Sequence, residues 1–99
     1  ITARQTVRTV QAIKAALFDY KHRIRNAHRF YSQDLINNLF MHPYTKIEFV
    51  QQDLQVSRLT AAKYLEALVG TGFVRKLKVG RSNYYVNIEL DRILRAPPG

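Results

Sequence analysis

Apolar residues in the first third of the chain recur at steps of three and four, as on one face of an α-helix. The set comprises Val7, Val10, Ile13, Leu17, Tyr20, Ile24 and Ala27. Residues 2–29 contain neither Pro nor Gly, so we predict one continuous helix. At roughly 40 Å it would be too long for a small domain to cover. We therefore expect Val10, Ile13, Leu17, Tyr20 and Ile24 to contact either the remainder of a longer protein or a second copy of the chain.

Shorter apolar patterns follow and predict two short helices. Ser32 precedes the run Leu35, Ile36, Leu39 and Phe40, and it has the N-cap chemistry for a helix over 33–41. Thr45-Lys46-Ile47-Glu48 has the spacing of a capping box. This predicts a helix over about 46–52 with Thr45 as its N-cap.

A third helix and a hairpin complete the pattern. Ser57 is a predicted N-cap for a helix over about 57–69, in which Ala61, Tyr64, Leu65 and Leu68 share one face. Alternating residues over 73–79 and 84–88, with a turn containing Gly80 between them, predict a β-hairpin. We predict a mostly α fold with a small β-hairpin: a winged helix-turn-helix preceded by a long amphipathic helix. Its parts are a connecting helix over 1–30, a winged-helix domain over 31–95 and a tail over 96–99.

The net charge and its distribution along the chain indicate what kind of partner the predicted fold binds. The net charge is +9 over 99 residues, and two basic segments, 1–30 and 56–99, flank a slightly acidic segment over 31–55. Such an excess favours a polyanion or an acidic surface as partner. The chain has no cysteine, which excludes disulfides, thiolate zinc sites and cysteine nucleophiles. His22 and His28 do not have metal-pair spacing, so we expect no metal and no cofactor.

Apolar runs are too short to span a bilayer, so we expect no membrane partner. The chain begins at Ile1 rather than Met and shows no signal peptide. We therefore expect a cytoplasmic piece of a longer protein.

The segment from about Phe40 to Leu94 closely resembles the C-terminal winged-helix region of Fic (filamentation induced by cyclic AMP) proteins. The resemblance is carried by Val56-Ser57-x-x-Thr60-Ala61, Leu65-x-x-Leu68, Gly72 and Gly80-Arg81-x-x-x-Tyr85, together with the leading helix. It implies a parent enzyme that transfers AMP from ATP to a hydroxyl of a target protein. The family's catalytic motif, His-Pro-Phe-x-(Asp/Glu)-Gly-Asn-Gly-Arg, is absent, and His42-Pro43-Tyr44-Thr45-Lys46 matches only its start. We therefore expect no enzymatic activity from this chain and a catalytic core upstream.

Double-stranded DNA is the first expected partner. The candidate residues are Ser57, Arg58, Thr60 and Lys63 on the recognition helix, and Arg75, Lys76, Lys78 and Arg81 on the basic wing over 74–88. A guanidinium fork matches the two acceptors of guanine, so Arg58 is the candidate for a base contact, whereas the wing cations suit phosphates.

A protein-interaction role is the alternative. In that reading, the long helix forms a homodimer or packs on the upstream Fic core, and the outer face recruits targets of the parent enzyme or controls it. Leu59 and Ala62 on the supposed reading face favour this reading, because an apolar Leu is unusual on a phosphate-binding surface. Solvated surface charge explains the basic residues equally well.

Overall fold

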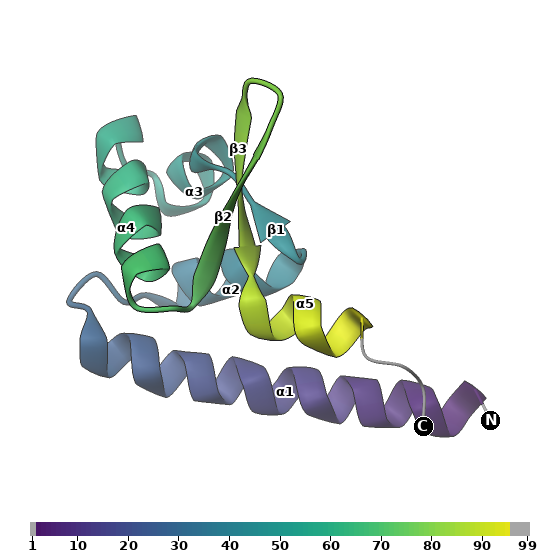
Figure 1. The fold of residues 1–99 in the computed structure, drawn as a ribbon. Coiled ribbons are helices and arrows are strands. Elements are labelled where there is room, and N and C mark those ends of the chain that lie inside the picture. The colour runs from purple at the N-terminus through teal and green to yellow at the C-terminus, as the bar shows by residue number, and fades with distance from the viewer. Residues whose placement is uncertain (1, 96–99) are drawn as a thin grey trace.

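The computed structural model describes residues 2–95, with side chains from Arg8 onward (Figure 1). The predicted tail over 96–99 and the side chain of Val7 lie outside the described residues. The elements are α1 (Thr2–Ala27), α2 (Gln33–Met41), β1 (Tyr44–Thr45), α3 (Ile47–Leu54), α4 (Arg58–Gly70), β2 (Val74–Val79), β3 (Ser82–Asn87) and α5 (Ile88–Arg95). This confirms the predicted fold class, mostly α with a small hairpin.

The three strands form one antiparallel sheet in the order β1-β3-β2. The hairpin register runs from Val74 opposite Asn87 to Val79 opposite Ser82. Strand β1 places Tyr44 opposite Val86 and Thr45 opposite Tyr85. The capping-box prediction is therefore wrong: Thr45 belongs to a strand, and the N-cap of α3 is Lys46, whose side chain makes no capping bond. Pairing with a strand some 40 residues later in the chain overrides the local capping signal.

Serine caps begin α2 and α4 as predicted. The Ser32 Oγ accepts a hydrogen bond from the Leu35 N–H, and the Ser57 Oγ accepts one from the Thr60 N–H. Helix α4 ends at Gly70, and Gly72 then adopts a φ of 84°, a conformation that L side chains rarely adopt.

The core lies between the sheet and helices α1 to α4. Tyr20 and Ile24 of α1 are 3% and 0% exposed and pack into it, with Leu17 partly buried beside them. The Tyr20 hydroxyl donates to the Phe73 carbonyl at 2.8 Å and accepts from the Glu89 N–H at 3.2 Å. This joins α1 to the start of β2 and to α5, which runs along α1 in Figure 1.

This packing corrects part of the interface expected along α1. Tyr20 and Ile24 belong to the domain's own core and cannot contact a second chain, because α2, α5 and the Phe73 ring cover that part of the helix. Val10 is 44% exposed and Ile13 is half-buried, so of the five residues expected at an interface these two remain the most available for an outward contact.

Candidate nucleic-acid interface

Helix α4 buries one face and exposes the other, as its sequence predicts. Ala61, Leu65 and Leu68 are fully buried against the core. Arg58, Leu59 and Lys63 are exposed on the opposite face, and Leu59 is 71% exposed. The helix follows α3 after a short turn, in which Gln55 has a left-handed φ of 56°. Packing against α3 and β2 therefore holds α4 with a polar, largely cationic face free.

The first turn of α4 uses two of the candidate side chains for its own structure. The Ser57 hydroxyl accepts from the Thr60 N–H at 3.2 Å and donates to the Thr60 hydroxyl at 3.0 Å. These two side chains fix where the helix starts, and thereby where Arg58 projects.

Arg58 pairs loosely with an acid of the neighbouring helix. Its guanidinium lies 3.4 Å from a carboxylate oxygen of Glu48, and the Lys46 ammonium lies 3.6 Å from the other oxygen. The Arg58 side chain is 65% exposed, so this pair is weak. A small cavity of about 110 Å³ lies here, and Arg81 at the hairpin turn lines it together with Arg58 and Lys46. The structure thus brings the hairpin turn to the first turn of α4.

Lys46 was missed by the sequence analysis. Its ammonium also lies 5.1 Å from the centre of the Tyr84 ring, which holds it beside the hairpin. Its position depends on β1 pairing with β3, for which the sequence offered no local signal.

Lys76 and Lys78 lie on the hairpin face that is turned toward α4. The Lys76 ammonium contacts Glu66 of α4 at 3.0 Å, and the Tyr85 hydroxyl donates to the same carboxylate oxygen at 2.8 Å. The hydrogen bonds from Tyr85 and Lys76 lower the pKa of Glu66. Burial and the bond to Glu66 raise the pKa of Tyr85 to about 12. Lys76 therefore forms an ion pair with Glu66 within the domain, whereas Lys78 makes no ion pair with any described residue.

Arg75 does not join this surface. Alternate residues of a strand point to opposite faces, so Arg75 lies on the face away from Lys76 and α4. Its guanidinium instead lies 3.5 Å from Asp91 of α5. The structure therefore separates Arg75 from the other candidate residues of the wing.

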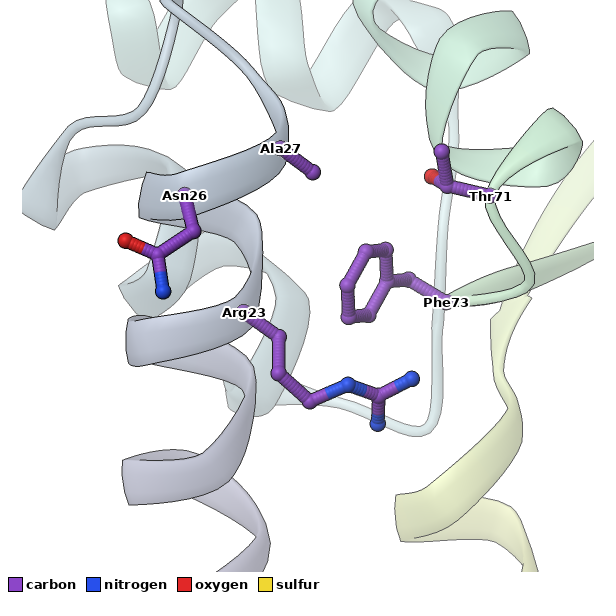
Figure 2. Close-up of a pocket in the computed structure, with 5 residues that line it drawn as sticks. All are labelled: Arg23, Asn26, Ala27, Thr71 and Phe73. Atoms are coloured by element: carbon purple, nitrogen blue, oxygen red, sulfur yellow. The ribbon is translucent and has the colours of Figure 1, made fainter.

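At the C-terminal end of α4, a different groove of about 460 Å³ separates that helix from the end of α1 (Figure 2). The Arg23 guanidinium lies over the Phe73 ring, 4.9 Å from its centre, and also contacts Asp19 at 2.9 Å. Thr71 lines the far wall and accepts or donates a 3.0 Å hydrogen bond with His28. Arg23 and Thr71 are thus already paired with neighbouring side chains, and the groove lies apart from the first turn of α4.

We define the α4–hairpin surface by exposed residues of the two elements: the cations Arg58 and Lys63 on α4 and Lys78 and Arg81 on the hairpin, with Leu59, Glu48 and Glu66. Of the four cations, Arg58 and Arg81 line one cavity. Among the described residues, no three His, Asp or Glu side chains gather as metal ligands would. No helix within residues 2–95 combines the length and apolarity needed to cross a membrane.

Comparison with known families identifies the chain. Residues 17–90 match the family described as "Protein adenylyltransferase SoFic-like, C-terminal domain". No curated protein matches the chain. Since the family match covers more than half of the sequence and spans the core, the sheet and α4, the chain belongs to the SoFic-like family of protein adenylyltransferase C-terminal domains.

Proposed function

We propose that this chain is a winged-helix DNA-binding domain in which α4 enters the major groove and the β2–β3 hairpin contacts the phosphate backbone. The element order from α2 to β3, with β1 paired to β3, is the arrangement that this reading requires. The observation that carries the proposal is the α4–hairpin surface, where Arg58 and Arg81 from separate elements line the same cavity.

Charge availability supports this role. Lys63, Lys78 and Arg81 make no ion pair with described residues, so they can neutralise phosphates without breaking a contact. Arg58 would exchange its contact with Glu48 for a base edge or a phosphate. Because both partners of that pair are more than half exposed, the exchange costs little.

A binding role is proposed in place of a catalytic one. The Fic catalytic motif is absent from the sequence, and His42, which starts the partial match, ends helix α2. We further propose that the domain acts in the cytoplasm beside an AMP-transferring core, which it directs to DNA or regulates.

Protein recognition through the same surface is the second candidate. Leu59 is 71% exposed in the first turn of α4, and an apolar side chain there suits a protein partner. In a DNA complex, the same side chain would contact a thymine methyl group.

Fluorescence anisotropy with a random duplex at two salt concentrations separates these candidates. Four phosphate contacts predict a salt slope of about −3.6, which is roughly a 150-fold loss of affinity between about 50 and 200 mM salt. The variant Arg58→Glu/Lys63→Glu should abolish binding. The control Lys14→Glu/Lys21→Glu makes the same charge change on α1 and should retain most of it.

If both variants lose the same share of duplex affinity, the binding depends on the net charge of the chain and not on the position of Arg58 and Lys63. Absence of binding at low salt would refute DNA recognition and favour a protein partner at Leu59.

A further inference from the structure

A second cavity lies on a part of the domain that the proposed DNA-binding role does not use. It has a volume of about 230 Å³ and lies between the end of α2, strand β1 and helix α3. No described residue of α4 or of the β2–β3 hairpin lines it.

Large apolar side chains form part of the cavity wall and remain exposed. Met41 is 66% exposed, Tyr44 46% and Phe49 42%. The Tyr44 ring is held in place by an edge contact with the Tyr84 ring, with 5.5 Å between their centres. Two aromatic rings and a flexible thioether side chain thus offer an apolar contact surface that the described residues leave open to solvent.

The polar part of the wall consists of Asn38, His42, Thr45, Gln52 and Asp53. The Asn38 side-chain amide donates to the Asp53 carboxylate at 2.8 Å. Because a carboxylate accepts but does not donate, this bond fixes the amide nitrogen toward Asp53 and leaves the Asn38 Oδ1 as an acceptor. That atom and the Thr45 Oγ1 are the two buried side-chain polar atoms within the described residues that have no hydrogen-bond partner.

Their burial makes these two atoms unusual. Asn38 is 5% exposed and Thr45 is 2% exposed, and buried polar atoms in folded proteins are nearly always paired. Both residues line this one cavity. Both atoms are closed off from solvent, so a guest with several N–H donors would satisfy them only once the covering side chains have moved aside.

The charge and size of the cavity further restrict which chemical groups can bind in it. Its ionisable wall residues are Asp53 and His42, with no Lys or Arg, although the whole chain carries a net charge of +9. A volume of about 230 Å³ is below the range of about 300–1,000 Å³ typical of small-molecule sites and suits a single large side chain. A guanidinium fits this chemistry, because it carries five N–H donors in a plane that also stacks on aromatic rings.

We propose that this cavity binds an arginine side chain presented by a peptide segment of a partner protein. The guanidinium pairs with Asp53 and donates to Asn38 and Thr45, while a neighbouring apolar residue of the peptide packs on Met41 and Phe49. The two acceptor atoms are closed off from solvent, so the exposed wall side chains shift outward as the guest enters. The proposal does not depend on DNA binding, since α4 and the hairpin stay free.

Titration of the ¹⁵N-labelled chain with capped peptides tests the proposal by NMR. The probe is acetyl-Gly-Phe-Arg-Gly-amide, and its matched partner carries Gln in place of Arg. We expect the Arg peptide to shift the Thr45 and Phe49 amide signals and the Asn38 side-chain signal. It should bind about tenfold more tightly than the Gln peptide, as expected for a charge-assisted contact.

Two single-charge variants make the test specific. Asp53→Asn keeps an acceptor for Asn38 but removes the charge, and it should weaken binding of the Arg peptide about tenfold while leaving the Gln peptide unchanged. Asp34→Asn makes the same charge change at an exposed position of α2 outside the cavity, and it should have little effect.

Equal affinity for the two peptides, signal changes confined to other surfaces, or equal losses in both variants would each overturn the proposal. Measuring duplex binding by Asp53→Asn separates the two sites, because that affinity should match the wild type.

Discussion

The Tyr20 hydroxyl links α1 by hydrogen bonds to Phe73, just before β2, and to Glu89 of α5. Tyr20→Phe removes this hydroxyl and nothing else. The ring keeps its edge contacts with Phe40 and Phe73, whose centres lie 5.4 and 5.0 Å away. The substitution therefore tests the two hydrogen bonds and leaves the packing in place.

The expected cost follows from what each partner loses. The Phe73 carbonyl keeps a second donor, the Ile88 N–H at 3.2 Å, and so remains paired. The Glu89 N–H, in the first turn of α5, loses its acceptor. One lost buried hydrogen bond and one partly buried orphan donor cost about 2 kcal/mol. For a domain of this size, that loss lowers the melting temperature by roughly 10 °C.

Urea and thermal unfolding, followed by circular dichroism, measure this directly. Tyr44→Phe is the matched control, because Tyr44 is 46% exposed, and it should change the free energy of unfolding by less than about 0.5 kcal/mol. A Tyr20→Phe protein that melts within about 2 °C of the wild type would show that the hydroxyl does not hold α1. An equal loss in Tyr44→Phe would refute the assignment to this contact.

Three further measurements test other parts of the structure. Glu48→Gln removes an acid from the α4–hairpin surface and should strengthen duplex binding about two- to fivefold by anisotropy, whereas unchanged affinity would place the phosphates elsewhere. The pKa of Tyr85, raised to about 12 by burial and by Glu66, exceeds the value of 10 expected in the unfolded chain. The folded state therefore holds this proton more tightly, so the contribution of Tyr85 to stability should be complete below pH 10 and be lost between pH 10 and 12. Urea unfolding at pH 8 and 11.5 should show a smaller fall for Tyr85→Phe. Gly72→Ala should cost about 1 kcal/mol, since its φ is 84° although a Cβ would meet nothing within 4 Å. Gly70→Ala, equally open and helical, should stabilise slightly, so equal signs in calorimetry would contradict the backbone explanation.

Local signals accounted for the elements that the sequence predicted correctly. The Ser57 cap, the buried positions of Ala61, Leu65 and Leu68, and the turn at Gly80 are each encoded within a few residues. These signals suffice for α4 and the hairpin, because neither requires a distant partner to be recognised.

Features that depend on distant partners were not predictable in the same way. Strand β1 has two residues and exists because β3 pairs with it, so Thr45 was misread as a helix cap. Tyr20 was assigned to an outward contact because periodicity shows which residues share a face but not what covers that face. Arg75 and Lys76 alternate along β2, yet only the register shows which of them faces α4.

The two hydrogen bonds of the Tyr20 hydroxyl and the contacts with α5 hold α1 against the rest of the domain. The direction of α1 is therefore tied to the direction in which α4 points. If a protein is joined to the start of α1 through a continuous helix, the number of helical residues between them determines how the two are rotated relative to each other. Adding one residue at such a junction would turn the domain by about 100° and advance it by about 1.5 Å. A short series of alanine insertions would thus orient the α4–hairpin surface in chosen directions around the axis of α1.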